Sequence, residues 1–305
     1  MKLAVASGKG GTGKTTVAVS LALSLADSSR PAGTGTPLYL DCDVEEPNAA
    51  LFLRPTMEEK REVSLLIPEV DPTLCTLCGR CAEICEYHAI AVIGEEVLVF
   101  PELCHGCGSC TRLCPEGAIH EIPNVIGTME RGQAGTLTFA HGTLNIGEPM
   151  AVPVIRDLKR WMLADDTGNR PVILDASPGA SCPVVETMRG ADVVLLVTEP
   201  TPFGLHDLRV AVEVARDELH LPVGVVINRD SIVYGGVDAY CEAENLPILM
   251  RIPLEREIAE GIAQGKPLIA IHLAYRERFR DLWRRLERMS MAGRDASYSR
   301  KAQRS

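Results

Sequence analysis

Short apolar runs alternate with longer amphipathic segments along most of the chain. Residues 2–7 (KLAVAS) have the pattern of a buried strand, and residues 17–26 (VAVSLALSLA) have the spacing of a helix. The alternation returns where ADVVLLVTE (191–199) precedes GLHDLRVAVEVARDEL (204–219) and PVGVVIN (222–228). Strands alternating with helices predict an α/β fold with a mostly parallel sheet and helices on both faces. In such folds, ligands bind at the carboxyl ends of the strands.

A glycine-rich loop, GKGGTGKTT, joins the first predicted strand to the first predicted helix. Its glycines allow backbone N–H groups to turn toward an anion at the helix N-terminus, where the helix dipole favours negative charge. Lys14 adds a positive charge for the β- and γ-phosphates of a nucleotide, and Thr15 offers a hydroxyl ligand for Mg²⁺. The predicted nucleotide-binding residues of the loop are Gly8, Lys9, Gly10, Gly11, Thr12, Gly13, Lys14, Thr15 and Thr16.

A second lysine, Lys9, stands near the start of this loop. The KGGTGKT form resembles the deviant Walker A loop of the MinD/ParA/Mrp superfamily of P-loop ATPases, which includes the nitrogenase iron protein and cobyrinic acid a,c-diamide synthase-like proteins. The resemblance implies an ATPase with catalytic roles for Lys9 and Lys14. It also implies an ATP-dependent homodimer in which Lys9 reaches the nucleotide of the partner.

Two later segments resemble the acidic landmarks of that superfamily. PLYLDCDVEEPN (37–48) implies that Asp43 positions or activates the attacking water, with Asp41 as a supporting charge. RPVILDASPG (170–179) implies that Asp175 is a Walker B aspartate acting on Mg²⁺ through water. The magnesium site implied by the resemblance therefore involves Thr15, Asp43 and Asp175.

Two further segments resemble the parts of the superfamily that surround the base. VGVVINRD (223–230) implies that Asn228 hydrogen-bonds the adenine and that Arg229 flanks it. RIPLEREIAEGIAQGKPL (251–268) matches a late loop and helix, which implies that Pro253, Leu254 and Glu255 lie near the base or ribose. The resemblance covers residues 1 to about 290.

Residues 71–120 break the strand and helix rhythm and carry two cysteine runs with the same C-x2-C-x2-C-x3-C spacing. In two-cluster bacterial ferredoxins, the fourth cysteine of each run ligates the cluster held mainly by the other run. We therefore expect two [4Fe-4S] clusters. One would be held by Cys75, Cys78, Cys81 and Cys114, and the second by Cys85, Cys104, Cys107 and Cys110.

Zinc is the alternative to the clusters, because pairs of CxxC motifs also build tetrahedral zinc sites. One departure from the ferredoxin pattern is that Glu86 follows Cys85, whereas Pro115 follows Cys114. Outside the two cysteine runs, Cys182 lies seven residues after Asp175. The nitrogenase iron protein carries a ligand for a bridging cluster at a similar offset, but a free thiol near the dimer face is the favoured interpretation here.

Charge and composition narrow the class of partner. The formal net charge of -10 argues against general affinity for nucleic acid or an anionic membrane. Lys9 interrupts the apolar stretch near the N-terminus, so no signal peptide is predicted, and the longest apolar runs are too short to span a bilayer. We expect a reducing, cytoplasmic location, no nucleic-acid partner and no membrane insertion.

These observations predict a discontinuous P-loop ATPase domain (1–70 and 121–290), an inserted α+β ferredoxin domain (71–120) and a disordered tail (291–305). The expected function is a dimeric ATPase switch that couples its nucleotide state to electron transfer to a partner protein. Two alternatives stay open: an iron-sulfur cluster carrier of the Mrp type, and a MinD-like assembly or positioning ATPase with structural or sensory clusters. The electron donor and acceptor, the client protein and the cluster potentials are not encoded in recognisable motifs.

Overall fold

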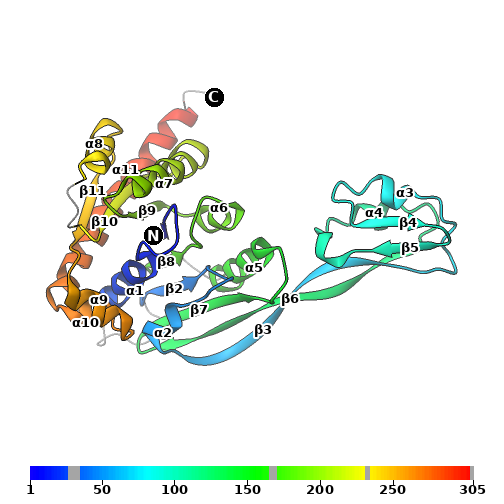
Figure 1. Cartoon of the computed structure of the whole chain (residues 1–305), viewed down its shortest axis with the longest axis horizontal. Coiled ribbons are helices and arrows are strands. Elements are labelled where there is room, and N and C mark those ends of the chain that lie inside the picture. The colour runs from blue at the N-terminus through cyan, green and yellow to red at the C-terminus, as the bar shows by residue number, and fades with distance from the viewer. Residues whose placement is uncertain (27–34, 165–169, 231–233, 303–305) are drawn as a thin grey trace.

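The computed structural model describes residues 1–26, 35–164, 170–230 and 234–302, and it describes side chains up to residue 293. In these residues the chain forms a broad α/β body and a small cysteine-rich module, which a long pair of strands carries away from the body (Figure 1).

One sheet runs through the body, and a separate hairpin belongs to the cysteine-rich module. In spatial order, the sheet in the described residues contains β11 (Ile248–Ile252), β10 (Val223–Asn228), β9 (Val193–Thr198), β1 (Lys2–Ala6), β8 (Val172–Asp175), β2 (Leu38–Asp41), β7 (Leu137–Leu144), β6 (Ile119–Ala134) and β3 (Thr56–Val70). The strands from β11 to β7 pair in parallel, whereas β6 and β3 are antiparallel. The predicted mostly parallel sheet is confirmed.

Helices connect the strands and cover the sheet (Figure 1). They are α1 (Lys14–Leu25), α2 (Ala49–Leu53), α3 (Arg80–Glu83), α4 (Ser109–Leu113), α5 (Ala151–Leu163), α6 (Cys182–Met188), α7 (Pro202–Val212), α8 (Gly236–Ala243), α9 (Arg256–Ala263), α10 (Leu268–Ile271) and α11 (Ala274–Ala302), with a 3-10 turn η1 (Pro101–Leu103) and a π-helical turn η2 (Glu213–Glu218).

The two faces of the sheet form two separate cores, because successive strand residues point to opposite faces. Leu38 and Leu40 of β2 pack with Leu158 of α5 on one face. Tyr39, one residue away, packs on the other face with α1 and with Phe279 of α11. Helices therefore cover both faces, as the alternating sequence pattern predicts.

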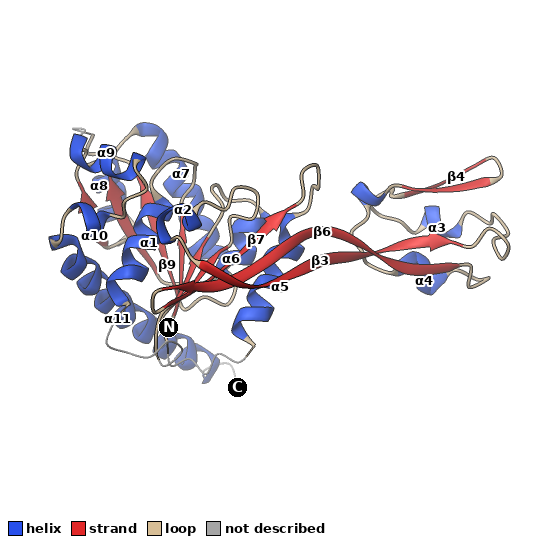
Figure 2. Ribbon diagram, turned by 90° about the horizontal axis from the view of Figure 1, so that it is seen from below, coloured by secondary structure: helices blue, strands red, loops and turns tan. Residues whose placement is uncertain are grey.

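The stalk is the antiparallel pair β3 and β6, and the cysteine-rich module comprises the residues between them, 71–118 (Figure 2). Its root is fixed to the body: Val63 is buried in the core of the α5 face, and the Arg61 and Arg131 guanidinium groups lie 4.4 and 5.1 Å from the centre of the Trp161 ring. The module itself adds the hairpin of β4 (Ile90–Ile93) and β5 (Glu96–Val99).

Two elements of the structure lie at the predicted domain limits. Strand β3 ends at Val70 and β6 begins at Ile119, so the predicted domain boundaries at residues 71 and 120 fall at the outer end of the stalk. Helix α11 continues to Ala302, into the segment predicted to be a disordered tail, and residues 303–305 of that tail lie outside the described residues. Among the described helices, none is both long and apolar enough to cross a membrane.

Candidate functional site

The glycine-rich loop lies between β1 and α1, at the carboxyl edge of the parallel strands. Gly11 and Gly13 have φ angles of 78° and 89°, in the left-handed region that favours glycine. A Cβ at Gly13 would lie 2.3 Å from Nδ2 of Asn228, which itself donates to the Thr12 carbonyl at 2.7 Å. The loop therefore needs glycine at position 13 and packs directly against Asn228 at the end of β10.

Lys14 begins α1 and lies in a buried cluster of carboxylates. Its Nζ donates to Oδ1 of Asp175 at 2.9 Å and lies 3.9 Å from Oδ2 of Asp43. The Tyr39 hydroxyl donates to the other Asp175 oxygen at 2.7 Å. Burial alone would lower the pKa of Lys14, but Asp175 reverses that effect and the pKa is raised. The structure thus brings the predicted residues Asp43 and Asp175 together around the ammonium group of Lys14.

The carboxylates of β2 are buried beside this pair. Burial and then the charge of Asp175 raise the pKa of Asp41 to about 7, although its oxygens accept from the backbone N–H groups of Asp43 and Ala49. Burial also raises the pKa of Asp43, against the opposing effect of Lys14. Oxygen ligands of this kind are those that Mg²⁺ prefers. In the glycine-rich loop, the Thr12 hydroxyl is buried and has no hydrogen-bond partner among the described residues, which fits a group that hydrogen-bonds a bound ligand.

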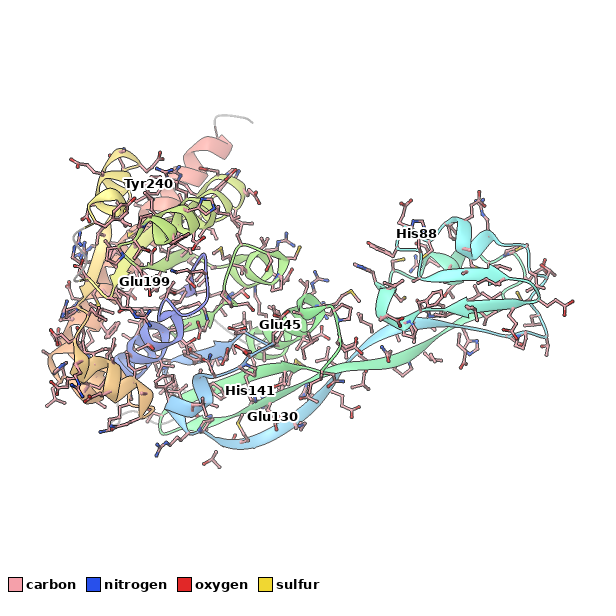
Figure 3. The ribbon with its side chains drawn as sticks, in the orientation of Figure 1. Glu45, His88, Glu130, His141, Glu199 and Tyr240 are labelled. Atoms are coloured by element: carbon pink, nitrogen blue, oxygen red, sulfur yellow. The ribbon has the colours of Figure 1, made fainter. Side chains whose placement is uncertain are left out.

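Lys9 forms an ion pair with Glu199, a residue that no sequence motif singled out. The Lys9 Nζ lies 3.2 Å from Oε2 of Glu199, which is labelled in Figure 3, and Oε1 of Glu199 accepts from Arg229 at 2.5 Å. Arg229 has a φ of 56°, an uncommon backbone conformation for a non-glycine residue. Glu199 directly follows β9, so the rule that functional residues follow parallel strands would have found it.

The late loop predicted to surround the base follows β11, next to β10. Asn228 pairs with Ile252 in the parallel ladder, which places Pro253, Leu254 and Glu255 at the same edge of the sheet as Asn228. Oε2 of Glu255 lies 3.7 Å from Nε2 of His272.

The eight cysteines of the module surround two small cavities of similar size, each of about 20 Å³. The first is lined by Cys75, Cys78, Cys81 and Cys114, and the second by Cys85, Cys104, Cys107 and Cys110. Each cavity therefore takes three cysteines from one run and the fourth from the other. This is the crossed grouping that the ferredoxin spacing predicts.

Backbone groups near the second cavity point at its sulfur atoms. The Ala89 N–H donates to Sγ of Cys85 at 3.3 Å, and the Gly106 N–H donates to Sγ of Cys104 at 3.5 Å. Such bonds stabilise the negative charge of cluster thiolates. Within the described residues, no three His, Cys, Asp or Glu side chains are placed to hold a single metal ion.

A row of polar side chains crosses the sheet from the nucleotide-binding edge to the stalk. The strand registers align Asp175 with Asp41, Asp41 with His141, His141 with Glu130, and Glu130 with Lys60, so these side chains share one face of the sheet. Nε2 of His141 lies 3.2 Å from Oε2 of Glu130, whose other oxygen lies 3.7 Å from the Lys60 Nζ (Figure 3). Nδ1 of His141 has no partner among the described residues.

The three remaining cysteines lie outside the cavities. Burial raises the pKa of Cys42 to about 12 and that of Cys241 to about 11, so both are expected to be unreactive thiols. Cys182 is exposed at the first residue of α6.

Comparison with known proteins identifies the family of the chain. Residues 3–268 match the family described as the CobQ/CobB/MinD/ParA nucleotide binding domain. An uncharacterized protein of Methanocaldococcus jannaschii is 28% identical over 276 residues, which cover 88% of this chain and 91% of that protein. An iron-sulfur cluster carrier protein of Aquifex aeolicus is 24% identical over 286 residues, covering 88% of this chain and 62% of that protein.

Solved structures show the same fold. The cell division ATPase MinD of Pyrococcus furiosus has a TM-score of 0.55 and 20% identity, with 94% of this chain and 98% of that chain covered. The MinD protein of Pyrococcus horikoshii, complexed with Mg-ADP, has a TM-score of 0.54 and 19% identity, with 92% and 93% covered. The glycine-rich loop, the parallel sheet and the extent of the sequence match place the chain in the CobQ/CobB/MinD/ParA family of nucleotide-binding proteins.

Proposed function

We propose that the chain is an ATP-hydrolysing dimeric switch that carries two [4Fe-4S] clusters and couples its nucleotide state to electron transfer to a partner. The observation that carries this proposal is the continuity of β6. This strand leaves the cysteine-rich module and enters the body beside β7, where Glu130 and His141 continue the polar row from the nucleotide-binding edge. A change at that edge therefore has a short physical route to the root of the stalk.

The nucleotide would bind along the carboxyl edge of the sheet, with its phosphates on the glycine-rich loop. Lys14 would leave Asp175 for the β- and γ-phosphates, and Thr15, Asp43 and Asp175 would hold Mg²⁺, which offsets phosphate charge. Asp43 would orient the attacking water. Asn228 uses Nδ2 on the Thr12 carbonyl, so its amide oxygen is the atom available to an adenine amino group.

The dimer would form over the same edge, with Lys9 crossing to the nucleotide of the partner. In this structure Lys9 is instead held by Glu199, and Glu199 also holds Arg229, the residue expected beside the base. One carboxylate thus restrains two cations that the ATP-bound dimer would use. The Glu199 side chain is 12% exposed, so solvent screens these two interactions only in part.

Replacing Glu199 with glutamine is expected to strengthen ATP-dependent dimerisation, because it removes the charge that holds Lys9 and Arg229 within one protomer. Partly exposed ion pairs contribute about 1 kcal/mol at most, so the dimer dissociation constant is expected to fall roughly fivefold. Analytical ultracentrifugation with a slowly hydrolysed ATP analogue measures it.

Two comparisons make this result specific. Glu213→Gln removes an exposed glutamate of η2 and should leave dimerisation unchanged. Lys9→Ala should keep nucleotide binding and weaken the dimer. A weaker dimer in Glu199→Gln would show that Glu199 supports the ATP-bound state rather than restraining Lys9 outside it.

The coupling itself is tested by EPR of the anaerobic protein, titrated with dithionite with and without Mg-ATP. Nucleotide binding is expected to shift the potential of at least one cluster or to change the spin coupling between the two, because cluster potentials respond to nearby charge and solvent. The Lys14→Ala variant, which should carry both clusters without binding nucleotide, is the control. Identical spectra and potentials in all four samples would contradict coupling between ATPase and clusters.

A cluster carrier is the second candidate, because the Aquifex aeolicus relative is described as an iron-sulfur cluster carrier protein. In that case the clusters would be cargo and would move to an apo-ferredoxin when the two proteins are mixed. Retention of both clusters through several ATP turnovers would favour electron transfer. A MinD-like assembly switch would instead change its ATPase rate with cluster oxidation state, without onward electron transfer.

A further inference from the structure

A pocket of about 250 Å³ opens beside the first cysteine cavity, at the far end of the cysteine-rich module. We call it the tip pocket. It lies between the segment that carries Pro72, Cys75 and Leu77 and the β4–β5 hairpin, which contributes Glu95 and Glu96. Cys75 lines both this pocket and the first cavity, so a molecule seated here would lie directly against a predicted cluster ligand.

The two cavities differ in their distance from the body. The second cavity is lined by Leu66 and Pro68, which lie within the stalk. The first is lined by Val70 and Ile119, where the stalk strands meet the module. The first cavity is therefore the distal one, in the module that the stalk holds away from the body (Figure 2).

Corresponding positions in the two cysteine runs show why the tip differs from the inner side. Each run needs a left-handed residue two positions after its first cysteine: Leu77 has a φ of 58° and Gly106 a φ of 62°. A Cβ at Gly106 would lie 3.1 Å from the Leu66 carbonyl oxygen of the stalk, so glycine suits that site for two reasons. At the tip, the bulky Leu77 occupies the corresponding left-handed position, at a strain of about 1 kcal/mol or more.

The strained leucine is only partly covered, although it lines both the first cavity and the tip pocket. Leu77 is 37% exposed, and Leu74 and Ile93 beside the pocket are 52% and 61% exposed. Apolar side chains that stay partly exposed at this end of the module suit a surface that another protein covers.

The rim of the tip pocket is acidic. Glu95 and Glu96 line it, and no basic side chain is among the described residues that do. Across residues 71–120 the sequence has seven acidic residues and two arginines, one of which, Arg80, is paired with Glu83. The charge around the apolar centre therefore favours a partner with a basic rim.

We propose that the tip pocket is the docking surface for a redox protein that presents an apolar side chain within a basic rim. This rests on the proposed electron-transfer function and names the cluster that faces the partner. A low-potential donor first reduces the protein by one electron. The electron then leaves the cluster of Cys75, Cys78, Cys81 and Cys114, which returns to its oxidised state, and the redox centre of the partner gains it. No bond breaks and no proton moves.

Ferricytochrome c, a basic haem protein, is the probe. The full-length protein with both clusters is reduced with dithionite, desalted anaerobically and mixed with the probe in a stopped-flow instrument. Glu95→Lys with Glu96→Lys is expected to lower the second-order rate constant about tenfold at low ionic strength, with the difference shrinking at high salt. The control is Glu58→Lys with Glu62→Lys, which makes the same change in net charge on exposed residues of the body end of β3.

A second variant tests the apolar centre. Leu77→Gly suits the left-handed backbone and so keeps the loop, but it removes the exposed side chain, and it is expected to slow electron transfer severalfold at every salt concentration. Equal rate losses in the two charge variants would overturn the docking surface, and so would an unchanged rate in Leu77→Gly. A protein that holds no cluster would overturn the proposed function as well, which iron content and EPR reveal beforehand.

Discussion

Nucleotide binding is expected to be lost when Lys14 is replaced with alanine, with affinity for ATP reduced at least about 100-fold (about 3 kcal/mol). Lys14 is the cation that faces Asp175 and Asp43, and Asp41 lies in the same buried cluster. Without Lys14, these carboxylates would repel a triphosphate instead of sharing a cation with it. Fluorescence titration with a labelled ATP analogue measures the loss.

The same substitution leaves Asp175 without its cation in a fully buried position, so the fold is also expected to become less stable. Lys14→Gln keeps a hydrogen-bond donor for Asp175 and separates loss of binding from loss of folding. Lys60→Ala removes an exposed stalk lysine and should leave binding unchanged. Wild-type affinity in a folded Lys14→Gln protein would show that the nucleotide does not occupy this loop.

The largest effect expected in the module comes from pairs of cysteine substitutions. Cys75→Ser with Cys114→Ser removes two ligands from the same cavity, although the two residues belong to different runs. That protein should keep about half of its iron and the EPR signal of one cluster. Cys75→Ser with Cys85→Ser removes one ligand from each cavity, although both residues belong to the first run. It should damage both clusters.

Iron analysis and EPR of the two double variants distinguish the possible groupings, because each grouping assigns the replaced cysteines to the two clusters differently. If each run held its own cluster, the results would be reversed: the first variant would lose both clusters and the second only one. Four-cysteine zinc sites would give neither a cluster absorption band nor an EPR signal in any variant.

Local sequence patterns were enough to predict the body. The loop from Gly8 to Thr16 and the apolar strands that end at Asp41, Asp175 and Asn228 are short-range signals, and parallel pairing brings their ends to one edge. The spacing of the cysteines likewise predicted the crossed grouping around two cavities. In each case the chemistry lies within a few residues of a recognisable turn or strand end.

The features that were not predicted depend on pairing between distant residues. Tyr39 reads as a core residue of a strand, and only the fold shows its hydroxyl on Asp175. His141 carries no ligand spacing in the sequence, and its contact with Glu130 follows from the register of two strands. The stalk was missed because Thr56–Val70 is polar for much of its length, so its antiparallel partner rather than a hydrophobic face defines it as a strand.

Because the stalk is long, a small rotation at its base would displace the cysteine-rich module at its far end. The 15 residues of β3 span roughly 50 Å at about 3.4 Å per residue. The ladder is irregular between Val63 and Ser64, just where the strand leaves the core of the body, and such irregularities are places where a ribbon bends. The part of β3 beyond this joint, from Ser64 to Val70, spans roughly 24 Å at about 3.4 Å per residue, so a turn of about 5° would move its far end by roughly 2 Å. A small rotation at the base of the stalk would therefore shift the tip pocket relative to the body.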